Sequence, residues 1–475
     1  MMRTKWQVVV HVIVLTFGGL ATAQKITYGP IIGRGATPDQ MIVKWGTDSS
    51  TGPSSLSYAV KGGTLQPALG QETQNADKSY DHTTQLSGLR LDSTYDYRVQ
   101  AATLVSHELT TCPTAGAPMD LVFYGDSRND PLSSAGQTEH AKVVAQIVKR
   151  APDMVFESGD LVYDGKYAGY LSEVFPVIGE LVATVPFMAV PGNHDNDDPL
   201  SLDFGGASVL AANFSRLFPT PQATSTWTAY FAFTCGNAMF IGLDSEALLA
   251  AGHDQAQLTF LEDRLAAARA DAAIDHVFVW FHVSPYSPAT GLFAHGDNAN
   301  VESDWVPLFD DPTNKVTAVF TGHDHLYARM NDGSHVVYVV SGGAGAGSSN
   351  IGGASKATTA AAVAGFGFVS VHVAGKHVIG TAYDDSGTPV DNWNAESTNV
   401  SSSSSNDGGT MTDGGTMTDG GVMSGGTMNG GGAMSGGGVH SRGCSTSGNS
   451  DGSGGTLAVI LVALAFRVRR RRASV

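Results

Sequence analysis

The stretch MVFESGDLVYDG, residues 154–165, contains the pattern that decides the fold of the larger part of the chain. Its apolar run MVFE is followed at once by glycine, acidic and aromatic residues. A short apolar run of this kind is typical of a buried strand, and the polar residues mark the strand's end. Asp160 and Tyr163 are candidates for chemistry. Asp164 precedes a glycine, and we assign it to the turn that an Asp-Gly pair favours.

The same pattern recurs along the chain. Helical stretches separate several of these apolar runs, and the clearest are EHAKVVAQIVKR (139–150) and the Leu/Ala-rich segment 255–270. Alternation of strand and helix predicts an α/β domain, which we place at residues 114–395. The other predicted strands are LVFY (121–124), PFMAV (186–190), VFVWF (277–281) and TAVF (317–320).

Polar residues gather directly after each predicted strand. In α/β sheets, ligands bind beyond the carboxyl ends of the strands, so we expect these residues to meet at one edge. Carboxylates, an amide oxygen and imidazoles without thiolates suit Fe, Mn or Zn. The residues in question are Asp126, Asp160, Asn193, His194, His282, His323 and His325.

These donors outnumber the ligands that one ion needs. Two ions that share a bridging carboxylate are therefore the economical arrangement. Paired ions hold a phosphoryl group and acidify a bound water into hydroxide. The residue set thus predicts hydrolysis of a phosphate ester at a dinuclear metal site.

Residues 24–113 show a different pattern, with short runs of alternating apolar and polar residues, turn residues between them and no helical periodicity. This pattern predicts a small β-sandwich, with Trp45 and Tyr97 as core aromatic residues. The predicted strands are MIVKW (41–45), SLSYAV (55–60), HTTQLSGL (82–89) and YDYRVQAA (95–102).

Both ends of the chain predict export. Residues 1–23 combine Arg3 and Lys5 with an apolar run and a final Ala-Thr-Ala, which is typical of a secretory signal peptide. Residues 396–455 are almost entirely Gly, Ser, Thr, Asn, Asp and Met, and we expect a disordered tether. Residues 456–475 join a short apolar helix to an arginine cluster. That helix is short for a stable span, so we expect its removal or exchange rather than permanent anchoring.

The charge of the chain argues against nucleic-acid binding. The signal and the last segment contain seven basic residues and no acid, so 20 Lys and Arg remain against 44 Asp and Glu in the body. Phosphate contacts need clustered Lys and Arg, and the body contains no such cluster. Three cysteines form no CxxC pair, and the sequence leaves open whether Cys112 and Cys235 join in a disulfide.

Five blocks in order resemble the motifs of metallophosphoesterases: GD (125–126), GDLVY (159–163), GNHD (192–195), VWFH (279–282) and GHDH (322–325). The GDxxY pattern of the second block resembles the purple acid phosphatase branch. Two segments, GPIIGRGATPDQMIVKWGTD (29–48) and LSGLRLDSTYDYRVQ (86–100), resemble the fibronectin-type-III-like domain at the front of those enzymes. The resemblance covers residues 26–395 and implies a four-layer αββα catalytic domain. Gly443-Cys444 with the tail resembles the sorting tails of myxobacterial surface proteins, which implies processing near Cys444 and display on the cell surface.

The resemblance implies a role for each matched residue. It assigns Asp126, Tyr163 and His325 to a ferric ion, with Asp160 as the bridging ligand. It assigns Asn193, His282 and His323 to a second ion, Fe(II), Zn or Mn. His194 matches a histidine that contacts phosphate or assists the leaving group, and His295 in FAHGDN is a second substrate histidine. A phenol binds as phenolate only to a strongly acidifying ion, which agrees with ferric iron beside Tyr163.

One residue departs from the family pattern. Arg128 stands in the first block, GDSR, where purple acid phosphatases typically have glycine. Arginine cannot bind a metal, so we consider two roles for it: contact with substrate phosphate, or a salt bridge beside the ligands. We expect His140 to lie on a helix surface or beside the site, and Tyr327 and Arg329 to pack against or orient the last block.

The sequence therefore predicts a secreted or surface-displayed acid phosphatase that hydrolyses phosphate monoesters, with a metal-bound hydroxide as nucleophile. A phosphodiesterase or nucleotidase would use nearly the same ligands. A surface adhesion or scaffold protein with a structural metal site is the alternative that is not an enzyme; such sites are closed, whereas this one has positions for substrate.

Overall fold

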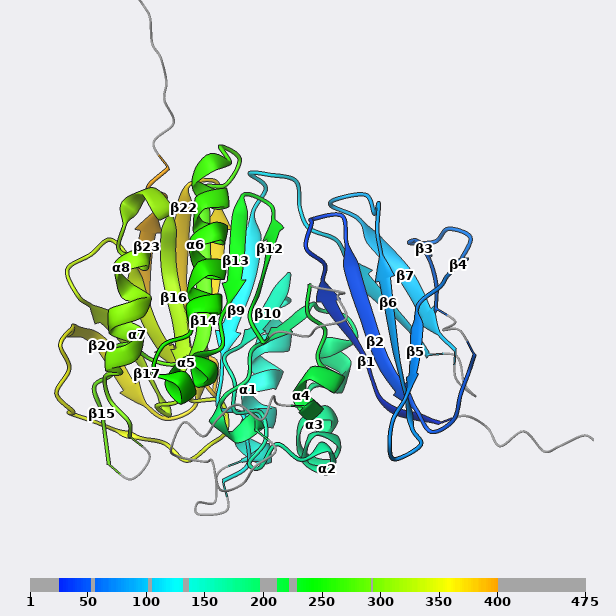
Figure 1. Ribbon diagram of the computed structural model, residues 1–475, viewed down its shortest axis with the longest axis horizontal. Helices are drawn as coiled ribbons and strands as arrows, with labels where there is room; N and C mark the ends of the chain where they lie inside the picture. The colour runs from blue at the N-terminus through cyan, green and yellow to red at the C-terminus, as the bar shows by residue number, and fades with distance from the viewer. Residues whose placement is uncertain are drawn as a thin grey trace, which may run out of the picture. The chain divides into compact units, whose positions relative to one another are not determined.

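The computed structural model describes residues 25–52, 56–100, 105–130, 136–196, 212–221, 229–291 and 294–399. Within them, two four-stranded antiparallel sheets form the N-terminal sandwich (Figure 1). Trp45 and Tyr97 are fully buried between the sheets, as predicted. One sheet has the order β1-β2-β6-β5 and the other β4-β3-β7-β8. The strands are β1 (Ile26–Arg34), β2 (Met41–Thr47), β3 (Leu56–Val60), β4 (Gln66–Ala68), β5 (Gln71–Gln74), β6 (Tyr80–Leu86), β7 (Thr94–Val99) and β8 (Val105–Thr110).

A six-stranded mixed sheet begins the α/β domain, in the order β11-β10-β9-β21-β22-β23. Its first three strands are parallel and the last three antiparallel. They are β9 (Met119–Tyr124), β10 (Met154–Glu157), β11 (Phe187–Ala189), β21 (Gly367–Ala374), β22 (His377–Asp384) and β23 (Pro389–Glu396).

A second sheet of seven strands has the order β12-β13-β14-β16-β18-β17-β20. Strands β13, β14, β16 and β18 run parallel in its centre. The strands are β12 (Phe231–Cys235), β13 (Ala238–Gly242), β14 (His276–Val283), β16 (Val316–Gly322), β17 (Leu326–Asn331), β18 (Val337–Ser341) and β20 (Thr358–Ala364), and β15 (Ala289–Thr290) pairs separately with β19 (Asn350–Ile351).

Helices cover the outer faces of both sheets. Figure 1 shows α5 and α6 lying along the seven-stranded sheet. The helices near the six-stranded sheet are α1 (Gln137–Arg150), α2 (Tyr167–Gly169), the π-helix η1 (Tyr170–Val174), α3 (Phe175–Val182) and α4 (Ala212–Leu217). Those of the other side are α5 (Ser245–Ala251), α6 (Gln255–Ala270), α7 (Ala299–Asp304) and α8 (Val306–Phe309), and the 3-10 helices are η2 (Asn193–Asp195) and η3 (Pro312–Asn314).

Side-chain alternation along the strands builds the layers. On β9, Phe123 packs between the two sheets while Val122 packs toward α1 and α3. On β14, Trp280 enters the space between the sheets and Phe281 the layer beneath α5 to α8. β9 and β14 are therefore buried on both faces, which explains their nearly continuous apolar runs. The predicted sandwich and αββα domain are confirmed.

The five ligand-bearing strands divide between the two sheets of the predicted αββα domain, and the sequence did not show which strand joins which sheet. β9, β10 and β11 belong to the six-stranded sheet, whereas β14 and β16 belong to the seven-stranded sheet. The two sheets face each other across a shared apolar core, so strand ends from both reach the same region. Apolar runs look alike in either sheet, and the sequence therefore did not separate them.

The predicted signal peptide, the predicted apolar tail and the predicted tether from residue 400 onward lie outside the described residues. The tether prediction was wrong for residues 396–399, because Glu396 ends β23 and Asn399 Nδ2 donates to Asp275 Oδ1 at 2.9 Å. Within the part of the chain that the structure describes, no helix is long and apolar enough to cross a membrane.

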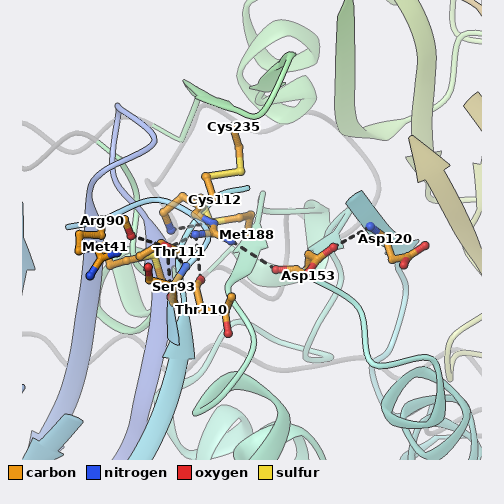
Figure 2. The surroundings of a disulfide bond; sticks show 11 residues. Met41, Arg90, Ser93, Thr110, Thr111, Cys112, Asp120, Asp153, Met188 and Cys235 are labelled. Atoms are coloured by element: carbon orange, nitrogen blue, oxygen red, sulfur yellow. Dashed lines mark hydrogen bonds between the residues drawn. A yellow bond between two sulfur atoms is a disulfide. The ribbon is translucent and has the colours of Figure 1, made fainter. Parts of the chain in front are cut away.

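The segment that follows the sandwich is joined covalently to the α/β domain. Cys112 and Cys235 form a disulfide, which the sequence had left open (Figure 2). Lys44 of β2 donates to the carbonyl of Ser215 in α4 at 2.8 Å. Arg216 of α4 pairs with Asp81 of β6 at 2.9 Å. These contacts hold the sandwich against α4, which belongs to the α/β domain.

Candidate metal centre

Five strand ends bring the predicted site residues together. Asp126 follows β9, Asp160 follows β10 and Asn193 begins η2 after β11. His282 lies on β14, and His323 follows β16. The donor groups thus come from short segments that begin where rigid buried strands end.

Three of these residues have left-handed backbone conformations. Asp126, Asp160 and His323 have φ of 60°, 62° and 68°. Each follows a glycine, and such conformations are uncommon outside glycine, Asn and Asp. Residues of this kind cost on the order of 1–3 kcal/mol and gather at functional sites. Hydrogen bonds hold the conformations, since Asp126 N donates to Gly159 O at 2.9 Å and His323 N to Asp126 Oδ2 at 2.9 Å.

One group of donors consists of Asp126, Asp160 and His325. One ligand atom from each lies within 4.8 Å of the others, and all three side chains are buried. Asp126 Oδ1 lies 3.4 Å from His325 Nε2 and has no hydrogen-bond donor among the described residues. His325 Nδ1 donates to the carbonyl of Gly347 at 2.6 Å, so Nε2 presents its lone pair to the carboxylate.

A second group surrounds His282. Its Nδ1 donates to the carbonyl of Ser158 at 2.9 Å, which leaves Nε2 as an acceptor. Nε2 lies 3.1 Å from Asn193 Oδ1, 3.1 Å from His323 Nδ1 and 3.4 Å from Asp160 Oδ1. Asp160 therefore borders both groups, as a bridging carboxylate would.

The electrostatics of the site favour a cation. Burial disfavours the charged form of His282, but Asp160 and Asp126 outweigh burial and raise the pKa of His282 to about 9. Burial likewise disfavours ionised Asp160, but His282, His194 and Arg128 hold the pKa of Asp160 well below its usual range. The carboxylate is therefore ionised, and the acceptors around His282 attract a proton or a metal ion.

This donor set fits two metal ions. Lone pairs of histidine nitrogens and carboxylate oxygens face one another in two adjoining groups. These atoms repel one another unless positive charge lies between them. Ligating histidines usually donate their other ring nitrogen to a carbonyl or carboxylate, as His282 and His325 do.

The remaining predicted site residues surround the two groups. His194 donates from Nδ1 to the carbonyl of Tyr163 at 2.7 Å, and its Nε2 lies 4.0 Å from Asp160 Oδ2. The ring of Tyr163 lies 5.1 Å from that of His194, centre to centre. His295 is exposed and stacks on His323 with 3.7 Å between ring centres. Both histidines are thus next to the groups of donors.

Arg128 is buried and bonded to Asp160. Its Nε donates to Asp160 Oδ2 at 3.3 Å, and its Cζ lies 5.6 Å from the centre of the Tyr163 ring. Of the two roles that the sequence left open, this geometry is that of the salt bridge.

The sequence also predicted positions for three residues outside the donor groups. His140 is not on the helix surface, because it is buried beside Tyr124 with 5.9 Å between ring centres. Tyr327 and Arg329 both bind the carboxylate of Asp391 on β23, at 2.7 and 2.8 Å. These last two join β17 to the edge of the other sheet, in agreement with a packing role.

Asp195, to which no motif assigned a role, supports the centre. Its buried carboxylate accepts from the backbone N–H of Asp160 at 2.8 Å and of Gly192 at 2.9 Å. It also accepts from the hydroxyl of Tyr170 at 2.8 Å. Asp195 therefore ties the ends of β10 and β11 together. The feature of the sequence that could have identified Asp195 is its position in the GNHD block.

Both folded domains match known families. Residues 123–327 match the family model of calcineurin-like phosphoesterases, and residues 30–111 match that of the purple acid phosphatase N-terminal domain. The resemblance seen in the sequence motifs is thereby confirmed.

Relatives and solved structures agree with this architecture. An uncharacterized protein of Mycobacterium tuberculosis is 23% identical over 332 residues, which cover 63% of this chain and 61% of that protein. Human tartrate-resistant acid phosphatase type 5 is 26% identical over 238 residues, 46% of this chain and 70% of that enzyme. The purple acid phosphatase PPD1 from yellow lupin seeds has the same fold, with a TM-score of 0.66, 19% identity, and coverage of 77% of this chain and 74% of that one.

Proposed function

We propose that this chain, which joins a purple acid phosphatase N-terminal domain to a calcineurin-like phosphoesterase domain, hydrolyses phosphate monoesters with the help of two metal ions. The observation that carries the proposal is the buried convergence of Asp126, Asp160 and His325 beside the donors around His282. A buried set of this kind would be costly without a cation.

The proposed ligands divide between the two ions. Asp126, His325 and Tyr163 would hold the first ion, and a phenol ligand would favour Fe(III) there. Asn193, His282 and His323 hold the second, for which Fe(II), Zn and Mn all suit the nitrogen and oxygen donors. Asp160 borders both groups and would be the ligand shared by the two ions.

When bound, two such ions activate a water molecule and neutralise the charge on the phosphate oxygens. The residues of the chain then have separate tasks. His295 is exposed beside His323, within reach of a substrate that arrives from solvent. His194 has its Nδ1 proton committed to the Tyr163 carbonyl, which directs Nε2 toward the donor groups. One of these two histidines protonates the departing alkoxide, a task for which imidazole is suited near neutral pH.

Removal of the metals tests this proposal. The protein is treated with a chelator and assayed with an aryl phosphate, and activity should disappear and return when metal is added. Asp160→Asn should lower turnover by at least about 100-fold, because the shared ligand is lost. Asp164→Asn is the matched control, since Asp164 lies in the same segment and pairs with exposed Lys166 in the turn. Full activity of the chelated protein or of Asp160→Asn would exclude the mechanism.

Substrate comparison separates the alternatives. Turnover of monoesters should exceed that of diesters. The reverse order would support a phosphodiesterase, and selective turnover of nucleoside monophosphates a nucleotidase. Metal binding with no turnover of any ester would support a structural metal site in a surface protein.

We also propose that the protein is exported and held at the cell surface by its tail. The support is the pattern of the sequence at residues 1–23 and 456–475. Mass spectrometry of the protein isolated from the cell surface should find the chain beginning at Gln24 and processed near Cys444. An intact chain in the cytoplasm would contradict this.

A further inference from the structure

Asp324 lies between two proposed ligands, His323 and His325, yet its carboxylate serves another segment. It is buried, and Oδ1 accepts from the backbone N–H of His295 at 2.7 Å. Oδ2 accepts from the N–H of Gly296 at 3.1 Å. One carboxylate therefore binds two successive amides, with one oxygen for each.

These bonds fix the position of the His295 ring. Gly296 has φ of +73°, which lets the two amides point toward the same carboxylate. With the backbone held, the His295 ring stacks on His323 at 3.7 Å. The contact joins two segments of the chain, because Asp324 and His323 are neighbours in one block while His295 lies 29 residues before Asp324.

The segment that carries His295 has a second, separate attachment. Asp297 Oδ1 accepts from Ser287 N at 2.9 Å, and Asp297 Oδ2 accepts from Lys356 N at 2.7 Å. Asp297 thus closes the base of the segment. Of these two aspartates, Asp324 is the one that joins the segment to the block of metal ligands.

Charge-assisted bonds to a buried carboxylate are strong and directional. An exposed imidazole held only by stacking would sample several positions, and small displacements of a catalytic group reduce rates greatly. A residue that limits this freedom acts on catalysis without touching the substrate.

We propose that Asp324 is a positioning residue for His295, whose ring it holds over the second metal site for contact with the leaving group of the ester. The proposal rests on the proposed function for its catalytic consequence, but the attachment itself is measurable without activity.

The first experiment measures the attachment. Hydrogen–deuterium exchange is followed by mass spectrometry in peptides that contain His295 and Gly296, for the metal-loaded wild type and Asp324→Asn. The amide of asparagine offers one acceptor oxygen and turns a donor toward the second N–H. We expect exchange at these amides to accelerate about tenfold, the ratio that follows from loss of one hydrogen bond. Unchanged exchange would overturn the proposal.

Asp254→Asn provides the control. The Asp254 carboxylate also accepts from two backbone amides, those of Ala256 and Gln257, but it caps α6. Asparagine is as good a cap as aspartate, so this variant should match the wild type in exchange and turnover.

The second experiment tests the catalytic consequence with two esters. An alkyl phosphate needs an acid for its leaving group, whereas 4-nitrophenyl phosphate needs one much less. We expect Asp324→Asn and His295→Ala both to lower kcat on the alkyl ester by at least about tenfold and to affect the aryl ester less. In the double variant the two losses should not multiply, because both act through one ring.

Three outcomes would contradict the role. Equal losses on both esters, multiplied losses in the double variant, or loss of bound metal in Asp324→Asn would each show that Asp324 serves the metal block instead. Failure of the proposed function is distinct, since it would leave the wild type inactive on both esters while the exchange difference remained.

Discussion

Whether the hydroxyl of Tyr163 is a metal ligand distinguishes a site that holds ferric iron from a site that holds only zinc. The Tyr163 ring lies beside that of His194, whose Nε2 is 4.0 Å from Asp160 Oδ2. With Fe(III) bound, the phenolate ligand should give a visible charge-transfer band and a purple protein. Tyr163→Phe should abolish the band while the protein stays folded. A visible spectrum with elemental analysis checks this, and an active, colourless protein that contains only zinc would return Tyr163 to a packing role.

The buried guanidinium of Arg128 balances the charge of Asp160. Removal of one partner of a buried charged pair leaves the other uncompensated, at a cost of about 3–5 kcal/mol. We therefore expect Arg128→Met to lower stability and to alter the metal content, with little change in KM. Urea denaturation, elemental analysis and steady-state kinetics measure these effects. A higher KM with normal metal content would instead indicate contact with substrate phosphate.

At the scale of residues, motif spacing predicted the residues that converge, but not what supports them. The sequence singled out Asp126, Asp160 and His325, which the structure brings within 4.8 Å. It gave no role to Asp195 or Asp324, because their task is to bind backbone amides of other segments. Such a contact depends on where two distant loops meet, and no local pattern in the sequence encodes it.

Glycines at the strand ends let the ligand segments approach closely. A Cβ added to Gly322 would overlap the Asp126 carboxylate and lie 2.9 Å from Ser158 Oγ. Gly322→Ala should therefore displace Asp126, lower the metal content and cost about 1–3 kcal/mol of stability.

Gly179→Ala is the control for this change. It lies in α3, and an added Cβ there meets no atom within 4 Å, so the helix should gain about 0.5–1 kcal/mol. Elemental analysis and thermal unfolding compare the two variants. Full metal content in Gly322→Ala would show that the strand end tolerates a wider separation.

At the scale of elements, long apolar runs and clear helices were predictable and their pairing was not. β9, β10, β14 and β16 lie within a few residues of their predicted positions, as do α1 and α6. The antiparallel strands β20 to β23 escaped prediction, since they are only partly buried and small or polar residues interrupt their apolar runs. Division of the strands between two sheets follows from packing across the shared core, a long-range property.

The whole protein should be less stable at higher pH when its metals are removed. Burial and the neighbouring Asp160 raise the pKa of Asp195 to about 7. Burial opposes the charge on His282, but Asp160 outweighs it, and the pKa is raised to about 9. In the unfolded chain these values are about 3.9 and 6.5. Through these two groups the folded state binds more protons than the unfolded state, so their contribution to stability falls as pH rises from 6.5 to 8.

Bound metal should weaken this dependence, because it replaces the proton on His282. Urea denaturation midpoints of chelated and metal-loaded protein, measured at several pH values in this window, make the comparison. The decrease should be larger in the chelated sample. Equal slopes would show that His282 is not a ligand, and calorimetry at pH 7 should detect a proton released on metal binding.

The relation of the sandwich to the α/β domain was the least predictable property of the molecule. Tyr97 was expected in the sandwich core, and it is there, but its hydroxyl also donates to Ala183 of the other domain at 2.6 Å. Arg34 of β1 is buried, and in addition to the carbonyl of Thr110 in its own domain at 3.1 Å it donates to the carbonyl of Asp153 in the α/β domain at 3.5 Å. The residues next to Arg34 in the sequence do not show that this buried cation contacts the other domain.

The disulfide between Cys112 and Cys235 makes that relation covalent, and its removal should be costly. The bond closes a loop of 123 residues, and a loop of this size restricts the unfolded chain by about 4–5 kcal/mol. Cys112→Ala/Cys235→Ala should therefore shift the denaturation midpoint to lower urea, with Cys444→Ala as the control that keeps the bond. Both bonded cysteines are fully buried, so reductant should not reach them in the folded protein. It should act on the unfolded chain, where it removes the difference between wild type and the double variant. A double variant as stable as the wild type without reductant would mean that the noncovalent contacts of Lys44 and Arg216 already hold the two domains together.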